Sequence, residues 1–282
     1  MSRLARLVFS IRRSRQALPD AFAGSAPGLA ALATDLRFKR WARLAGLLGA
    51  NLHLLAALCG TDKFGLHDYT AVYEELTRPL RRRVVTLLEL GVGGYGRHLG
   101  GESLLMWAAY FPKGRIYGID IEDKTALSRG RIKVFQVSQT DRDALASLCR
   151  QIGPFDFVVD DGSHVNAHQI ESFRILWPFV RDGGSYVVED VQTSYWPSYG
   201  GGMPGSRGYQ SSCMNFFKSL ADSVNQCEFL EAPRFETDAG IGRIAFHHNM
   251  IVVTKDASPR SSNLPLGDKA LRARLMRPRA SS

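Results

Sequence analysis

Short apolar runs alternate with helical stretches over residues 84–190, and this alternation most constrains the fold. The run at 84–90 reads VVTLLEL and is closed by glycines, which predicts a buried strand that ends in a tight turn. Further strands are predicted at 115–120, 131–137, 155–160 and 185–190, with helices at 103–111, 141–151 and 167–180. Strands that alternate with helices indicate a parallel, doubly wound α/β sheet.

The pattern changes after residue 190. Residues 191–208 are rich in Ser, Tyr, Gly and Pro and are too long for a simple connection, so we interpret them as a functional loop or lid. A helix is expected at 209–225, and 241–247 with 250–255 predict a hairpin. An antiparallel hairpin that closes a mostly parallel, seven-stranded sheet is typical of Rossmann-like methyltransferase folds, and we expect that fold here.

The net charge of +9 is concentrated at the two ends of the chain. Residues 1–43 hold nine Lys/Arg against two acids, and residues 259–282 hold six against one, so acids outnumber bases in the middle. We therefore expect a basic, mainly helical extension at 1–58 (with a helical stretch at about 31–58) and a basic, disordered tail at 258–282, on either side of a catalytic domain at 59–257. We expect these basic ends to be solvated and to bind no nucleic acid. The alternative is that they make weak contact with an anionic membrane.

Other bulk features predict a cytoplasmic protein. No apolar run approaches the roughly 20 residues of a membrane-spanning helix, and the start lacks the long apolar core of a signal peptide. The four cysteines are scattered without metal-binding spacing, which predicts reduced thiols. We further expect a homo-oligomer.

A glycine-rich turn follows the first predicted strand and predicts a cofactor site. Gly91, Gly93 and Gly96 fit the dinucleotide spacing, so NAD stays open on the motif alone. Asp120 ends the second strand, where a carboxylate accepts hydrogen bonds from ribose hydroxyls; an exposed strand-end aspartate is the alternative. Glu89 would repel a pyrophosphate and attract a sulfonium, which favours S-adenosylmethionine.

Two acidic clusters end the next two predicted strands. They are Asp160-Asp161, followed by His164, and Glu189-Asp190. Three converging carboxylates repel one another unless a cation lies between them, which predicts a Mg²⁺ site. His164 then suits proton removal from a hydroxyl. The alternative is structural, since neighbouring aspartates on a strand point to opposite faces and one can bond the fold itself.

Several stretches together resemble the metal-dependent sugar O-methyltransferases that methylate macrocin and mycinamicin, and the mycobacterial enzymes that methylate polysaccharide or glycolipid sugars. The similarity covers about residues 55–256. The matching stretches are GTDK (60–63), HDY (67–69), LELGVGGY (88–95), GGESLLMW (100–107), YGIDIEDK (117–124), QVSQTD (136–141), DFVVDDGSH (156–164), GGSYVVEDVQTSYWPSYGG (183–201) and HHNMIVVTK (247–255).

The resemblance implies an S-adenosylmethionine- and Mg²⁺-dependent enzyme that methylates a sugar hydroxyl of a glycosylated natural product, glycolipid or polysaccharide. A catechol-like or other small-molecule diol is the alternative acceptor. The implied metal ligands are Asp161, Glu189 and Asp190, the implied base is His164, and the implied donor-site residues are Gly91, Gly93, Ser103, Asp120 and Gln139. Two positions depart from the family pattern: Leu105 stands in place of arginine and His247 in place of tyrosine.

Overall fold

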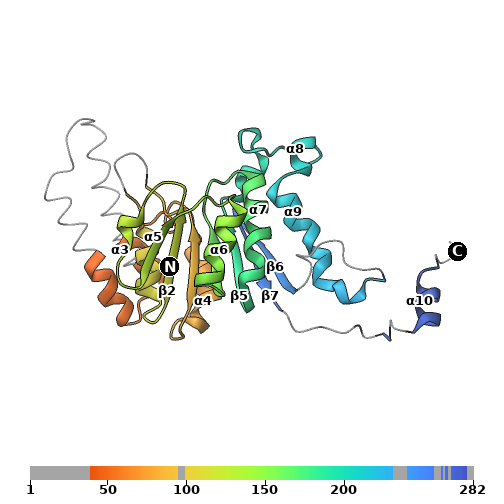
Figure 1. The fold of residues 1–282 in the computed structure, drawn as a ribbon, viewed down its shortest axis with the longest axis horizontal. Helices are drawn as coiled ribbons and strands as arrows, with labels where there is room; N and C mark the ends of the chain where they lie inside the picture. Colours follow the sequence, from red (N-terminus) through yellow and green to blue (C-terminus); the bar gives the residue numbers. More distant parts are fainter. Residues whose placement is uncertain are drawn as a thin grey trace. The chain divides into compact units, whose positions relative to one another are not determined.

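A computed structural model describes residues 39–94, 99–230, 240–256, 262, 264–265 and 268–277. The chain divides into two compact units, Met1–Ala144 and Leu145–Ser282. Seven strands form a sheet in the order β3-β2-β1-β4-β5-β7-β6. Figure 1 labels β2 in the first unit and β5, β7 and β6 in the second. Their bounds are β1 Thr86–Leu90, β2 Arg115–Asp120, β3 Ile132–Gln136, β4 Phe155–Asp160, β5 Val180–Glu189, β6 Ile241–His247 and β7 Met250–Lys255.

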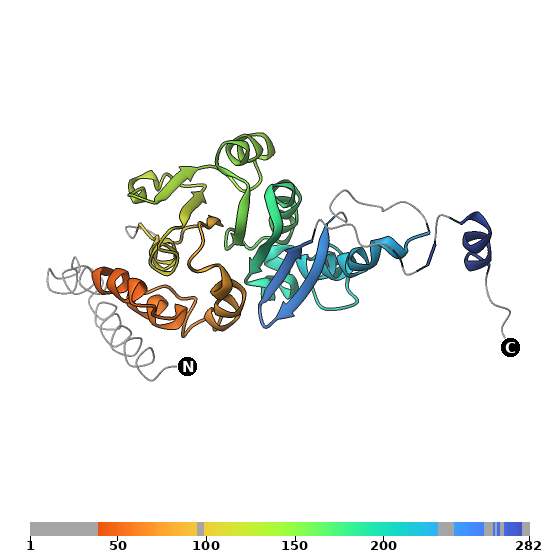
Figure 2. The ribbon, with the colours of Figure 1, turned by 90° about the horizontal axis from the view of Figure 1, so that it is seen from below.

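The pairing of the strands confirms the predicted fold class. β2 runs parallel to β1 and β3, and β4 runs parallel to β5. β7 is antiparallel to both β5 and β6, and Figure 2 shows β6 and β7 side by side. The chain therefore has the Rossmann-like methyltransferase architecture, a mostly parallel sheet with an antiparallel hairpin at its C-terminal end.

Helices and aromatic side chains build the core of the first unit. All five residues of β1 are buried, as expected for a parallel strand covered on both faces. Tyr73 and Trp107 meet edge to face with ring centroids 5.0 Å apart. Besides a helix at 39–47, the described helical elements of this unit are α3 Leu52–Cys59, α4 Thr70–Thr77, η2 Arg78–Leu80, α5 Glu102–Tyr110 and η3 Thr125–Leu127.

The helical stretch predicted at about 31–58 consists of two helices where the chain is described. Residues 39–47 form one helix and α3 forms another. Gly49 adopts a left-handed backbone, with φ of 88°, and the Asn51 side chain accepts a hydrogen bond from the backbone N of Leu54 and so caps α3. A left-handed glycine followed by a capping asparagine ends one helix and starts the next.

Phe173 lies at the centre of the second unit's aromatic core. Its ring contacts those of Trp177, Tyr186 and Phe217, with centroids 4.9–5.2 Å apart. Helix α6 (Arg142–Ile152) leads into this unit. Its other helical elements are α7 Asn166–Leu176, η4 Trp177–Phe179, η5 Val191–Tyr195, η6 Pro197–Tyr199, α8 Arg207–Gln210, α9 Cys213–Ser219, η7 Leu220–Glu228 and α10 Lys269–Leu275.

Two predicted segments of the second unit differ in detail. The single helix expected at 209–225 is three short elements, because Ser212 accepts a hydrogen bond from the backbone N of Asn215 and starts a new helix. Within the tail expected to be disordered, α10 is helical, and Asp268 caps it by accepting bonds from the backbone N of Ala270 and Leu271. No helix in the part of the chain that the structure describes is long and apolar enough to cross a membrane.

Candidate donor and metal sites

The glycine turn after β1 is held in a conformation that needs glycine. Gly91, Gly93 and Gly94 all have positive φ, between 67° and 86°. A Cβ on Gly100 would lie 2.3 Å from the carbonyl oxygen of Gly93, so the backbone closes on itself here. A Cβ on Gly93 would meet nothing within 4 Å, so open space adjoins this turn. Gly96, the third glycine of the spacing, lies outside the described residues.

Asp120 organises the same turn from the end of β2. Its Oδ2 accepts a hydrogen bond of 3.1 Å from the backbone N of Val92. Lys124 lies four residues on, with its Nζ 3.3 Å from that oxygen, and donates to the carbonyl oxygens of Gly93 and Gly94. Asp120 and Lys124 therefore tie the first two strands together where a cofactor would lie.

Glu89 is completely buried and carries two partners within the fold. Lys63 Nζ lies 3.2 Å from Glu89 Oε1, and Ser103 Oγ donates to Glu89 Oε2 at 2.9 Å. The lysine is also buried, so its charge balances that of the carboxylate. We had favoured a sulfonium because we expected Glu89 to carry an uncompensated negative charge, and the ion pair with Lys63 weakens that electrostatic argument.

Gln139 lies in the turn between β3 and α6 and is half-buried. The structure thus joins Glu89 with Ser103, and Asp120 with the glycine turn, through direct contacts. For Gln139 the role in donor binding stays a prediction.

The second candidate site lies where β4 and β5 end. These strands are parallel neighbours, with Asp160 opposite Val188, so the residues that follow them share one sheet edge. Asp161, His164 and Asp190 each offer a ligand atom, and these atoms all lie within 4.8 Å of one another. His164 Nε2 is 3.5 Å from Asp190 Oδ2 and 3.9 Å from Asp161 Oδ1. Two carboxylates and one imidazole therefore converge at this edge of the sheet.

The backbone at this site is strained. His164 and Asp190 have φ of 56° and 53°, and Asn249, in the hairpin turn, is the other non-glycine residue with positive φ in the described part of the chain. Such conformations cost free energy and are retained where a side chain must be aimed for function. His164 Nδ1 is buried and has no hydrogen-bond partner among the described residues.

Asp160 does not join this cluster but anchors β4 in the core. Its Oδ2 accepts hydrogen bonds from Ser172 Oγ at 2.5 Å and Tyr186 Oη at 2.8 Å. Burial raises the pKa of Asp160 to about 6, and the two hydrogen bonds oppose that rise. The expected alternation of neighbouring aspartates is therefore present, since Asp160 is fully buried and Asp161 is half-buried.

Glu189 is placed differently from the other implied ligands. It is the last residue of β5, its side chain is buried, and it is not a member of the group formed by Asp161, His164 and Asp190. Its backbone carbonyl accepts a hydrogen bond of 2.9 Å from Gln169 Nε2. Ligation of a metal by Glu189 thus remains a prediction from the resemblance.

The sequence interpretation missed Lys63 and Lys124 as functional residues. A signal was present for each, because Lys63 ends the matching stretch GTDK and Lys124 follows Asp120 by four residues in IEDK. A lysine bonded to the two glycine carbonyls controls the shape of the turn without facing a ligand itself, which is why motif chemistry did not single it out.

Asn166 was also missed, and it organises the loop after β5. Its Nδ2 donates to the carbonyl oxygens of Thr193 and Tyr199, and its Oδ1 accepts from the backbone N of Cys213. Within this loop Trp196 remains 47% exposed. The predicted functional loop is therefore an ordered segment fixed to α7 and α9, with an aromatic side chain open to solvent.

Comparison with known proteins identifies relatives of this chain. An 8-demethyl-8-alpha-L-rhamnosyl tetracenomycin-C 2'-O-methyltransferase from Streptomyces olivaceus is 42% identical over 208 residues, which are 72% of this chain and 54% of that protein. Mycinamicin VI 2''-O-methyltransferase from Micromonospora griseorubida is 42% identical over 69% of this chain and 50% of its own length. The chain thus spans about half the length of the curated relatives it matches. No protein-family model matches it.

A solved structure agrees with these relatives. MycE methyltransferase from the mycinamycin biosynthetic pathway, in complex with Mg, SAH and mycinamycin VI, superposes with a TM-score of 0.67 at 40% identity, over 73% of this chain and 54% of that chain. The fold is that of a Rossmann-like methyltransferase. The chain is a homologue of the sugar O-methyltransferases of glycosylated natural products, as the sequence resemblance predicted.

Proposed function

We propose that this protein is an S-adenosylmethionine- and Mg²⁺-dependent O-methyltransferase that acts on a sugar hydroxyl. The observation that carries this proposal is the convergence of Asp161, His164 and Asp190 at the ends of β4 and β5. It occurs in a chain about 40% identical to enzymes named for sugar O-methylation.

The donor half of the proposal rests on the first unit. Positive-φ glycines leave space beside the turn, and Asp120 holds that turn at the carboxyl edge of the sheet. Glu89, balanced by Lys63, fixes the hydroxyl of Ser103 and so shapes the wall of the donor site. The MycE structure contains SAH, which supports the same cofactor class for this chain.

The metal half rests on the donor atoms of the second unit. Two carboxylates close together, with Asp190 held in a strained backbone conformation, fit a hard divalent cation, so Asp161 and Asp190 would hold Mg²⁺, with Glu189 as a third ligand by resemblance. When bound, the ion supplies positive charge that lowers the pKa of an acceptor hydroxyl. MycE is crystallised with Mg, which supports this choice of ion.

The residues of the chain then have separate roles. Asp161 and Asp190 would bind and orient the metal ion, and both lie beside the imidazole of His164. His164 takes the proton of the acceptor hydroxyl at Nε2, the nitrogen that faces the carboxylates. Trp196, half-exposed on the loop after β5, suits stacking on the face of a sugar ring.

The test is an acceptor screen with purified protein, labelled S-adenosylmethionine and Mg²⁺. We expect methyl transfer to glycosylated natural products, glycolipids or oligosaccharides, and none to their aglycones. Transfer to catechols but not to sugars would instead support the diol alternative. A cytoplasmic location, a homo-oligomeric state and weak membrane contact through the basic ends are further parts of this proposal, each measurable on the full-length chain.

A further inference from the structure

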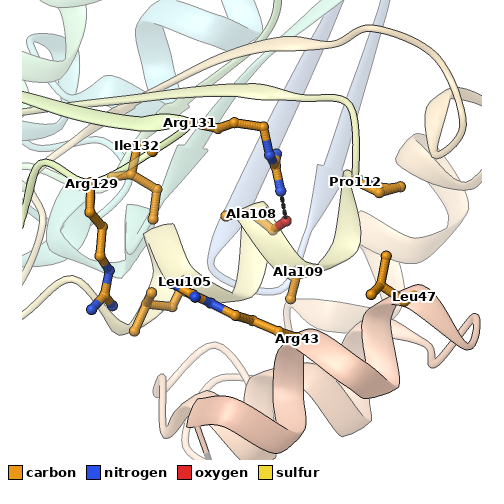
Figure 3. Close-up of a pocket in the computed structure, with 10 residues that line it drawn as sticks. Arg43, Leu47, Leu105, Ala108, Ala109, Pro112, Arg129, Arg131 and Ile132 are labelled. Atoms are coloured by element: carbon orange, nitrogen blue, oxygen red, sulfur yellow. Dashed lines mark hydrogen bonds between the residues drawn. The ribbon is translucent and has the colours of Figure 1, made fainter.

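A hollow of about 560 Å³ lies in the first unit, away from the residues predicted to bind the donor. It is formed by the helix at 39–47, helix α5 and the segment that enters β3 (Figure 3). Its size falls in the range of pockets that hold small organic molecules.

The base of this hollow is apolar. Leu47, Leu105 and Ile132 line it together with two alanines of α5 and Pro112. The surface is suited to the hydrocarbon part of a ligand.

Three arginines give the hollow its charge, and no acidic side chain is among its described lining residues. Figure 3 shows Arg43 reaching along α5 toward Leu105, while Arg129 extends from the segment before β3. Arg131 is already committed, because it donates to the carbonyl oxygens of Ala108 in the last turn of α5 and of Phe111 and Gly114 after it.

The other two guanidinium groups are available to a ligand. Both Arg43 and Arg129 are exposed, and neither side chain has an ion-pair or hydrogen-bond partner in the described ranges. Burial, and then the charge of Arg43, lower the pKa of Arg131, so the cations of Arg43 and Arg131 repel each other within this hollow. An anion bound at Arg43 would relieve that repulsion.

We propose that this hollow binds a phosphate monoester attached to an apolar body. The phosphate would accept paired hydrogen bonds from Arg43 and Arg129, whose planar guanidinium groups match phosphate oxygens. The apolar body would cover Leu47, Leu105 and Ile132. A dianionic head suits three neighbouring cations better than a neutral head or an apolar ligand alone does.

This site is separate from the proposed methyl-transfer chemistry. None of its lining residues is a predicted donor-site or metal-site residue. Ser103 and Leu105 lie on the same helix, but Ser103 is bonded to Glu89 whereas Leu105 lines the hollow. Failure of binding here would therefore leave the proposed methyltransferase activity untouched.

The test is calorimetric titration of the full-length protein with octyl phosphate below its critical micelle concentration. Inorganic phosphate and 1-octanol are titrated in parallel as head and body alone. We expect one site per chain for octyl phosphate and at least tenfold weaker binding of either part. Vesicles containing phosphatidic acid, titrated in the same way, separate a bilayer source of this chemistry from a free amphiphile.

Matched variants decide the outcome. Arg43→Gln and Arg129→Gln should each weaken octyl phosphate binding about tenfold, because each loses a charge-assisted hydrogen bond. Arg150→Gln, which removes an exposed arginine of α6 outside the hollow, should leave it unchanged. Unchanged thermal unfolding verifies that the variants fold. Equal binding by the Arg43→Gln, Arg129→Gln double variant, or octanol binding as tightly as octyl phosphate, would overturn the proposal.

Discussion

Lys63 and Glu89 form a buried ion pair, with Nζ 3.2 Å from Oε1 and side-chain exposures of 1% and 0%. The lysine comes from the segment between α3 and α4, and the carboxylate comes from β1. Since Ser103 donates to the other carboxylate oxygen, the pair also fixes the first turn of α5. The charge of Glu89 is therefore compensated within the fold, before any cofactor binds at the proposed donor site.

Removing the cation should be costly for stability. Lys63→Met leaves a buried carboxylate without its counter-charge, and we expect the free energy of unfolding to fall by about 3–5 kcal/mol. The Lys63→Met, Glu89→Gln double variant should recover part of that loss, because no uncompensated charge remains. Chemical denaturation measures both. Lys113→Met, at an exposed lysine of the same unit, is the control and should change stability by less than about 0.5 kcal/mol.

The fold was predictable because its signals are local. Each of the five predicted parallel strands is present, and the hairpin of β6 and β7 has the predicted bounds. Strand β5 begins at Val180, five residues before the predicted start at 185, because it continues through Gly183-Gly184 with an irregular register against β4. A helix break that depends on a single capping side chain, such as that of Ser212, leaves no mark in the pattern of apolar residues and was not predicted.

The candidate site was predictable only in part. Residues directly after strands, such as Asp161 and Asp190, are placed by the topology of a parallel sheet, so sequence order is enough to bring them together. Partners from distant segments, such as Lys63 for Glu89, depend on tertiary packing that no local pattern contains. Strand alternation predicts that Asp160 and Asp161 differ in burial, but only the structure shows which of the two side chains faces the core.

Asp120 should be essential for donor affinity. Asp120→Ala removes the acceptor for the backbone N of Val92 and the partner of Lys124, so the glycine turn loses its support. We expect S-adenosylmethionine and S-adenosylhomocysteine to bind roughly 10- to 100-fold more weakly, as for the loss of a charged hydrogen bond. Calorimetry measures this. Asp143→Ala, at an exposed acid of α6, should bind normally; normal binding by the Asp120 variant would remove it from the donor site.

Thiol reactivity should follow burial. Burial raises the pKa of Cys149 to about 12, so almost none of it is thiolate at pH 8, whereas Cys227 is half-buried and accessible. We expect iodoacetamide to label Cys227 well before Cys149 in the native protein, and both at similar rates in denaturant. Peptide mass spectrometry over time gives the rates. Rapid native labelling of Cys149 would contradict the packing of α6.

The acidic residues should separate metal binding from donor binding. Asp161→Ala and Asp190→Ala each remove a carboxylate from the cluster, so we expect Mg²⁺ affinity and turnover to be lost while S-adenosylhomocysteine still binds. We expect Glu189→Gln to lose turnover as well, as the resemblance implies. Full turnover by Glu189→Gln would instead limit the ligand set to the residues that converge in the structure. Full turnover of the unmodified protein after exhaustive chelation would remove the metal from the proposed mechanism.

His164 should contribute as a base and not as a ligand. Its Nε2 faces Asp161 and Asp190 from 3.9 and 3.5 Å, but imidazole is a softer ligand than Mg²⁺ prefers. The variant must respect the backbone, whose φ is 56°, and asparagine tolerates that conformation better than alanine does. We therefore expect His164→Asn to lower turnover by roughly 10²–10⁴ at neutral pH, the usual contribution of general base catalysis.

The pH–rate profile distinguishes this role from metal binding. Raising the pH should partly restore His164→Asn, because hydroxide can then take the proton that the imidazole removed, while Mg²⁺ affinity stays within a few-fold of normal. The matched control is His168→Asn, which should keep its turnover. His168 lies on the neighbouring helix α7, and its imidazole is bonded to Ser163. If His164→Asn loses Mg²⁺ instead, the residue is a ligand and the proton acceptor lies elsewhere. If its turnover is normal at neutral pH, His164 has no part in proton removal.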